Sequence, residues 1–296
     1  MWSRRVALAC VLLALVTVTA GACTGSGSEG GLKVVASFYP LAWAAQQVGG
    51  DHVTVEDLTP PGVEAHDTVL TAGQQADLQS APLVLILGRF GFQPDVEQAA
   101  AEASGRVVAV TGGMHLLPSQ ERGLGYDPHV WLDPVLMEQI VTQAGDALIA
   151  IDPAGKAGYI ARESATVEDL RRLDTEYRSG LANCAFTTFV ATHEAFGYLA
   201  DRYGLTQLGI EGLTPESEPS AARIQAAVDA IRAGTAGPAV FYEDTAEGKR
   251  VGASVAGDAG VPALALGTLE FDPSPGTYLS VMRSNLSNLR DGLRCR

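Results

Sequence analysis

Short apolar runs alternate with stretches of helical periodicity along the first half of the chain. The apolar runs predict strands, and the stretches that repeat apolar residues every three or four positions predict amphipathic helices. The predicted strands are residues 32–38, 51–59, 81–88 and 106–110, and the predicted helices are residues 40–50, 67–79, 94–103 and 134–151. Strands that alternate with helices are typical of parallel sheets covered by helices. The pattern therefore predicts an N-terminal α/β lobe over residues 32–152.

A much longer helical pattern follows the turn at Asp152 and Pro153. Its apolar residues recur at intervals of three, four or seven, and they are Ile160, Val167, Leu170, Leu173, Tyr177 and Leu181. A helix over residues 154–181 spans about 40 Å, because each residue adds about 1.5 Å. We therefore predict a linking helix within residues 153–183 that joins two lobes as a rigid rod. Two shorter helices broken near residues 164–166 are the alternative.

The alternation of strands and helices resumes after the long helix. The predicted strands are residues 186–192, 238–244 and 261–267, with an extended segment at 205–213, and the predicted helices are residues 194–204, 217–234, 245–260 and 276–293. Ser220 precedes the second of these helices as an N-cap, as Asp133 does for the helix at 134–151. Residues 184–296 are therefore predicted to form a second α/β lobe.

The N-terminus has the features of a signal peptide. Arg4 and Arg5 precede an apolar run over residues 6–16, and small residues follow it. The run is too short to span a bilayer as a mature helix. We predict that residues 1–22 are a signal peptide, which places the folded part outside the cytoplasmic membrane.

A cysteine stands at the predicted cleavage point. The sequence TAGAC, which ends at Cys23, resembles the lipobox of bacterial lipoproteins, with Ala20 where that motif more often has leucine. We predict that Cys23 is lipidated and anchors the protein to the cell membrane, and that residues 23–31, rich in Gly and Ser, form a flexible tether. An ordinary secretory signal cleaved elsewhere is the alternative.

Composition narrows the possible partners. The 296-residue chain carries a net charge of −14, which becomes −16 once residues 1–22, with two arginines and no acidic residue, are removed. Such acidity excludes nucleic acid as an expected partner, since phosphate-binding proteins rely on basic surfaces. No further apolar run is long enough for a transmembrane helix.

The sequence contains four cysteines, for which we predict three different roles. Cys10 belongs to the signal peptide and Cys23 to the lipid anchor, which leaves Cys184 and Cys295. Two remaining cysteines in an exported protein are expected to form a disulfide bond, and two buried free thiols are the alternative. No CxxC motif is present, so a thiolate metal site is not expected.

Three of the five histidines lie where ligands bind in α/β proteins. His66 stands at a turn before a helical pattern, His129 stands between two Asp-Pro turns, and His193 follows a predicted strand. Open α/β sheets bind ligands at the carboxyl ends of their strands, and imidazole is a favoured zinc ligand. Three imidazoles on three loops predict one metal site. His52 and His115 are interpreted as ordinary histidines.

Known catalytic motifs are incomplete in this sequence. Three histidines and a water molecule on zinc also describe a hydrolytic site. However, Gly197 stands where an HExxH helix needs its second histidine, GASVAG has one residue too many for a GxSxG elbow, and AIDPAGKA lacks the first glycine and the final Ser/Thr of a P-loop. We therefore predict a binding protein and not an enzyme.

Several longer motifs carry a family resemblance over nearly the whole mature chain. They are ASFYPLAWAAQQVGGD, PPGVEAHD, ADLQSAPLVLILGRFGF, DPHVWLDP, THEAFGYLADRYGL, ESEPSAARI and YLSVMRSNL. Together they identify the chain as similar to the solute-binding lipoproteins of bacterial zinc and manganese ABC transporters, the cluster A-I group related to ZnuA and TroA. The resemblance implies two Rossmann-like lobes with parallel sheets, joined by a rigid helix, with the metal between them.

The resemblance also implies a ligand set. His66 and His129 would come from the first lobe and His193 from the second. A histidine at the last position goes with zinc in this family, whereas manganese binders tend to have a carboxylate there, which agrees with the preference of zinc for nitrogen ligands. Zn(II) is therefore the expected transported ligand.

The sequence departs from the family pattern at the fourth ligand. Gly267 occupies the place where relatives often carry an aspartate after the last strand. Glu270 is the first candidate to replace it, and Glu64, Asp272 and a water molecule are the alternatives. The loop between His115 and His129 is also short and has no His-rich insertion, so zinc capture by a flexible His-rich arm is not expected.

The expected role is extracytoplasmic capture of Zn(II) and delivery to a cognate ABC permease for uptake. The lipid would keep the protein at the membrane near that permease, and the protein is expected to be a monomer. A manganese-binding member of the same family and a surface adhesin lipoprotein are the alternatives.

Overall fold

The computed structural model describes residues 31–214 and 219–296. The predicted signal peptide, Cys23 and the tether up to residue 30 lie outside the described residues. Within the described ranges, no helix has both the length and the apolar character that crossing a membrane requires.

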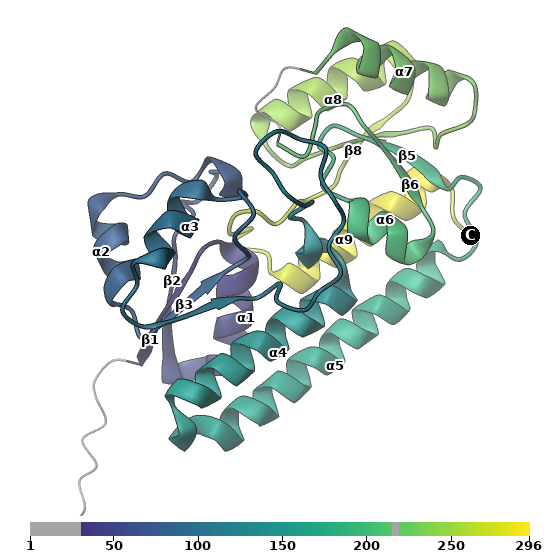
Figure 1. Ribbon diagram of the computed structural model, residues 1–296. Helices are drawn as coiled ribbons and strands as arrows, with labels where there is room; N and C mark the ends of the chain where they lie inside the picture. The colour runs from purple at the N-terminus through teal and green to yellow at the C-terminus, as the bar shows by residue number, and fades with distance from the viewer. Residues whose placement is uncertain (1–30, 215–218) are drawn as a thin grey trace, which may run out of the picture.

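The first sheet is parallel, with the strand order β2-β1-β3-β4. Its strands are β1 (Leu32–Ala36), β2 (Val53–Asp57), β3 (Leu83–Ile86) and β4 (Arg106–Ala109). Successive side chains of a strand face opposite sides of the sheet. Val34 therefore packs in the main core with α1 (Tyr39–Gly49) and α4 (Pro134–Ile151), whereas Val35 packs with α2 (Ala72–Ser80) and α3 (Pro94–Ala101). Helices thus cover both faces of the first sheet (Figure 1).

The second sheet repeats this design with the order β6-β5-β7-β8, again all parallel. Its strands are β5 (Thr188–Ala191), β6 (Thr206–Gly209), β7 (Val240–Tyr242) and β8 (Ala263–Ala265). Val190 packs in a separate core with α7 (Ala221–Arg232) and α8 (Ala246–Ala259), whereas Phe189 packs in the main core with α6 (Gly197–Tyr203) and α9 (Tyr278–Leu293). The predicted fold class, two parallel α/β lobes and a long helix, is confirmed.

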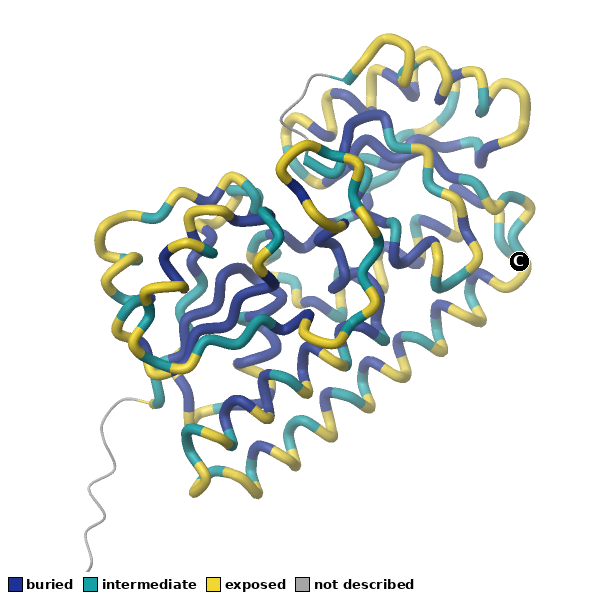
Figure 2. The backbone as a smooth tube through the Cα atoms, in the orientation of Figure 1, coloured by how far each residue is buried: buried dark blue, intermediate teal, exposed yellow. Residues whose placement is uncertain are grey.

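The long helix is continuous. After the short turn η4 (Pro153–Gly155), α5 runs for 26 residues, Lys156–Leu181, so the alternative of two shorter helices is wrong. Thr166, at the proposed break, donates its hydroxyl hydrogen to the Arg162 carbonyl within the helix. The helix lies beside α4 beneath both lobes (Figure 1), and buried and exposed positions alternate along it (Figure 2).

The boundaries of two predicted helices differ from the structure near the histidines. The helix predicted from residue 67 begins at Ala72, because Thr71 and Gln74 form a capping box that starts it there. Residues Ala65–Asp67 form the short 3-10 helix η2 instead. The helix predicted from residue 194 begins at Gly197. His66 therefore lies in the short turn η2, and His193 lies in the segment between β5 and α6.

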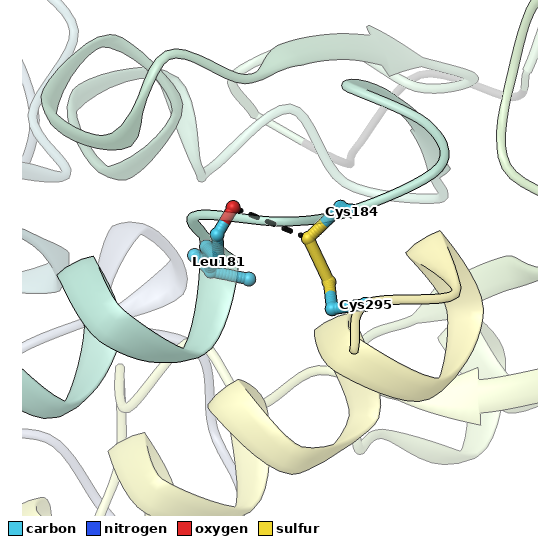
Figure 3. The surroundings of a disulfide bond; sticks show 3 residues. All are labelled: Leu181, Cys184 and Cys295. Carbon is cyan, nitrogen blue, oxygen red and sulfur yellow. Dashed lines mark hydrogen bonds between the residues drawn. A yellow bond between two sulfur atoms is a disulfide. The ribbon is translucent and has the colours of Figure 1, made fainter.

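The predicted disulfide bond is present between Cys184 and Cys295 (Figure 3). It joins the segment after α5 to the C-terminal tail across 111 positions of sequence, and the Ala185 N–H also donates to the Arg294 carbonyl. The bond therefore holds the last helix onto the second lobe.

Removing this bond is expected to destabilise the protein. A Cys184→Ser/Cys295→Ser variant should lose about 2–4 kcal/mol of unfolding free energy, because the unfolded chain regains the entropy of a long closed loop. Urea unfolding of the variant and the parent measures the difference, and a reducing agent should destabilise only the parent. Equal unfolding free energies would contradict the expectation.

Candidate metal centre

His129 is fully buried in the connection between β4 and α4, directly before the 3-10 turn η3 (Val130–Leu132). Its Nδ1 lies 2.8 Å from Asp127 Oδ1, and its backbone N–H donates to the same oxygen at 3.0 Å. Because a carboxylate accepts at Nδ1, Nε2 is the nitrogen that carries the lone pair when the imidazole is neutral. That nitrogen lies 3.4 Å from Glu270 Oε1, and both atoms have no hydrogen-bond partner among the described residues.

His193 follows β5 and is 1% exposed. Its Nδ1 lies 3.2 Å from Oε2 of Glu243, which follows β7 on the neighbouring strand. Its Nε2 donates to the Leu213 carbonyl at 3.1 Å. The Thr268 hydroxyl donates to the other oxygen of Glu243 and orients the carboxylate. Two neighbouring parallel strands thus end in a histidine and the carboxylate that holds it.

His66 lies in η2 with its side chain 3% exposed. Its Nε2 is 2.7 Å from Glu64 Oε2 and 3.9 Å from Glu270 Oε2. The rings of His66 and His193 are 6.4 Å apart between centroids, and those of His129 and His193 are 4.9 Å apart. The structure therefore brings the three predicted histidines together from both lobes.

Glu270 enters this cluster from the segment after β8 and is fully buried. Leu269, the residue before it, has a φ of 61°, a left-handed conformation that costs energy for a residue with a side chain. Glu270 Oε2 accepts from the Ala65 N–H at 3.0 Å, and the Trp131 indole N–H donates to the Thr268 carbonyl at 2.7 Å. The segment is thus fastened to the first lobe on both sides of Leu269.

The donor atoms suit a tetrahedral ion. Ligand atoms of His129, His193 and Glu270 all lie within 4.8 Å of one another. Donors about 2.1 Å from a tetrahedral zinc are about 3.4 Å apart. His66 lies outside this group of three, with its Nε2 3.9 Å from Glu270 Oε2. The chemistry also fits, since Nε2 of His129 and Oε1 of Glu270 face each other in a buried position with no other partner among the described residues.

The alternative fourth ligands are placed differently. Glu64 belongs to a second group with His66 and Asp67, less buried than the first. Asp272 is exposed and accepts hydrogen bonds from Ser274. The geometry therefore favours Glu270 over Glu64 and Asp272.

Negative charges in the cluster raise the pKa values of its imidazoles, whereas burial lowers them. Burial lowers the pKa of His193, but the charge and hydrogen bond of Glu243 raise it to about 10. Burial likewise lowers the pKa of His66, and Glu64 and Glu270 raise it to about 9. Burial raises the pKa of Glu270, whereas the nearby imidazole of His129 and the charges of the other imidazoles lower it to about 2. Glu270 is therefore ionised and available to a cation at neutral pH.

Zinc affinity is expected to increase with pH. Zinc ligation needs neutral imidazoles, whereas pKa values of about 9 and about 10 keep His66 and His193 protonated at pH 7. Binding should therefore release at least about two protons near neutral pH, and affinity should fall as the pH falls. Calorimetric titrations in buffers with different heats of ionisation measure this release. Zinc affinity that does not change between about pH 6 and pH 9 would contradict the assignment.

Sequence reasoning assigned no role to the two carboxylates that orient the ring nitrogens. Asp127 had a local signal, because it stands two residues before His129 in the Asp-Pro turn. Glu243 had a weaker signal, since it follows a predicted strand whose carboxyl end faces the ligand site. The pairing of Glu243 with His193 spans 50 positions and is visible only in the folded structure.

The chain is similar to known proteins in sequence and in fold. The profile of a family described as zinc-uptake complex component A, periplasmic (ZnuA), matches residues 34–292. The zinc-binding lipoprotein AdcA of Streptococcus pneumoniae is 32% identical over 282 aligned positions, covering 89% of this chain and 56% of AdcA. The chain thus spans little more than half of that relative.

A second relative aligns over its whole length. The high-affinity zinc uptake system protein ZnuA of Bacillus subtilis is 30% identical over 314 aligned positions, covering 99% of this chain and 98% of the relative. The crystal structure of the Zn(II)-bound ZnuA-like domain of S. pneumoniae AdcA has a TM-score of 0.77 and 32% identity, covering 89% of this chain and 99% of that domain. From the family profile and the full-length alignment, we conclude that this chain belongs to the ZnuA family of zinc-uptake components.

Proposed function

We propose that this protein captures Zn(II) outside the cytoplasmic membrane and delivers it to the permease of an ABC transporter. The observation that carries the proposal is the buried pair of His129 Nε2 and Glu270 Oε1, which face each other at 3.4 Å without other hydrogen-bond partners among the described residues. Relatives are named as zinc-binding and zinc-uptake proteins, and a Zn(II)-bound structure is among the similar ones.

The proposed ligands are His66, His129, His193 and Glu270. Three nitrogen donors and one oxygen donor suit zinc better than manganese, which prefers oxygen-rich sites. The buried carboxylate contributes a negative charge that offsets the charge of the ion. Asp127 and Glu243 would hold the outer ring nitrogens, so that His129 and His193 present defined faces to the metal.

The remaining parts of the proposal concern partners and location. We propose that Cys23 carries the lipid, that residues 23–31 form the tether, and that the protein acts as a monomer. The proposed units are an N-terminal lobe over residues 32–152, a linking helix within residues 153–183 and a C-terminal lobe over residues 184–296. The role is one of binding and delivery, and no catalytic step is part of it.

A metal titration tests the proposed function. Metal content and competitive zinc and manganese titrations are measured for the protein from Gly31 onward, together with radioactive zinc uptake by cells that carry the parent or a His66→Ala/His129→Ala/His193→Ala variant. One tightly held zinc per chain and an uptake defect in the triple variant are expected. Stronger competition by manganese would favour the manganese alternative. A protein that binds no metal would favour the adhesin alternative.

A further inference from the structure

The loop between β4 and η3, residues 110–129, belongs to the first lobe and contacts the second. The Leu117 N–H donates to the Tyr198 hydroxyl oxygen of α6 at 2.9 Å. The Tyr198 hydroxyl in turn donates to the Asp127 carbonyl at 2.9 Å. This loop lies in front of the junction between the lobes (Figure 1). Residues of this loop are therefore close enough to form hydrogen bonds with residues of the second lobe.

Glu121, at the turn of this loop, binds the segment that covers His193. Its carboxylate accepts from the Leu213 N–H, from the Thr214 N–H at 3.1 Å and from the Thr214 hydroxyl at 2.9 Å. Gly212 lies so close to the carboxylate that a Cβ there would collide with Oε1. Hydrogen bonds to an ionised group are about twice as strong as those between neutral groups. The contact thus fixes residues 212–214 against the loop.

Leu213, in this segment, accepts a hydrogen bond from the His193 nitrogen that zinc would bind. The Leu213 carbonyl is an acceptor only, so the His193 Nε2 that bonds to it at 3.1 Å carries a hydrogen. Nδ1 of His193 is held by Glu243, as Nδ1 of His129 is held by Asp127. Nε2 is therefore the nitrogen left for a metal. An imidazole nitrogen cannot donate a hydrogen and bind zinc at once, so Leu213 and zinc compete for it.

We propose that Glu121 is a positioning residue that weakens zinc binding and speeds zinc release by holding the Leu213 carbonyl on His193. The inference rests on the proposed zinc-binding function. Any contact that stabilises an arrangement incompatible with coordination lowers the affinity by its differential free energy between the two arrangements. We call the contact of Glu121 with residues 212–214 the latch. In a delivery protein the latch aids release, because the Leu213 carbonyl accepts the hydrogen bond from His193 Nε2 again as zinc leaves.

The test uses the full-length protein and the substitution Glu121→Ala. Zinc affinity is measured by competition with a chelator, and zinc dissociation is measured by stopped-flow mixing with excess chelator. The variant should bind zinc about fivefold or more tightly and release it correspondingly more slowly, within the usual range of coupling between sites. A general loss of structure would instead weaken binding, so the direction of the change separates the latch from a merely structural role.

Two further variants sharpen the result. Thr214→Val removes one of the three donors and should shift affinity in the same direction by a smaller factor, which keeps the test informative if Glu121→Ala folds poorly. Asp201→Asn is the matched control, because Asp201 is an exposed acidic residue of α6 that lines the same cavity, of about 610 Å³, as Glu121. It removes one negative charge and should leave affinity unchanged.

The outcomes distinguish the latch from the function on which it rests. Parent protein that binds zinc tightly, with Glu121→Ala and Thr214→Val at the same affinity or weaker, would overturn the latch alone. An equal gain in affinity in Asp201→Asn would also overturn it, because the effect would then come from total charge. Parent protein without zinc binding would overturn both proposals.

Discussion

Replacing His129 by alanine is expected to weaken zinc binding by about 100-fold to 1,000-fold. Zinc sites with four protein ligands have binding free energies of about 10–16 kcal/mol, so one ligand accounts for about 3–4 kcal/mol. His129 is fully buried, and its Nε2 has no other partner among the described residues, so no neighbouring donor is in place to substitute for it. Competition titration with a zinc chelator measures the loss.

Two comparison variants bracket this effect. His115→Ala should keep the parent affinity, because His115 is exposed and belongs to neither group of potential metal ligands in the described chain. Asp127→Asn should lose about 10-fold to 100-fold, as is usual when the residue that orients a metal-binding histidine is changed. If His129→Ala bound zinc as tightly as His115→Ala, the proposed ligand set would be wrong.

Replacing Trp131 by alanine is expected to cost about 3–5 kcal/mol of unfolding free energy. Its side chain is fully buried and packs against Phe38, with ring centroids 4.7 Å apart, and against Phe92, at 5.7 Å. The substitution leaves a large cavity in the main core and leaves the Thr268 carbonyl without its indole donor. Denaturant unfolding of the metal-free parent and variant measures the cost.

A more conservative change separates packing from positioning. Trp131→Phe keeps most of the buried ring but removes the hydrogen bond to Thr268, two residues before Glu270. It should cost only about 1–3 kcal/mol, the usual penalty for a buried polar group left unsatisfied. It should still weaken zinc binding, because the segment that carries Glu270 loses one of its attachments to the first lobe. Unchanged zinc affinity in Trp131→Phe would show that this attachment does not position the ligand.

The placement of α5 bears on how the protein accommodates zinc. The helix packs with α1 and α4 of the first lobe, and near its C-terminal end the Tyr177 hydroxyl donates to the Met282 carbonyl of α9 at 2.6 Å. A continuous helix that contacts both halves resists wide separation of the lobes. We therefore expect zinc binding to involve loop segments such as residues 211–214. A large compaction on zinc addition, measured by X-ray scattering, would contradict this expectation.

Much of the fold follows from local features of the sequence. Alternating apolar runs and helical periods predict both parallel sheets, because each element carries its own pattern of burial. Asp133 and Ser220, predicted as N-caps, accept from backbone N–H groups at the starts of α4 and α7. The sequence pattern did not predict η2, a short turn that stands where the first turn of a helix was predicted.

Some features of the candidate site also follow from the sequence, and others depend on the tertiary structure. The sequence by itself determined the two-lobe α/β pattern, the long helix, the cysteine pair and the three histidines, since residue type and neighbouring residues carry these signals. Only the tertiary structure decided that Glu270 stands between His66 and His129, that Glu243 holds His193, and that Leu213 occupies its Nε2. These partners lie 20 to 204 positions apart. Their contacts depend on how two separately wound sheets are packed together, which no local pattern encodes.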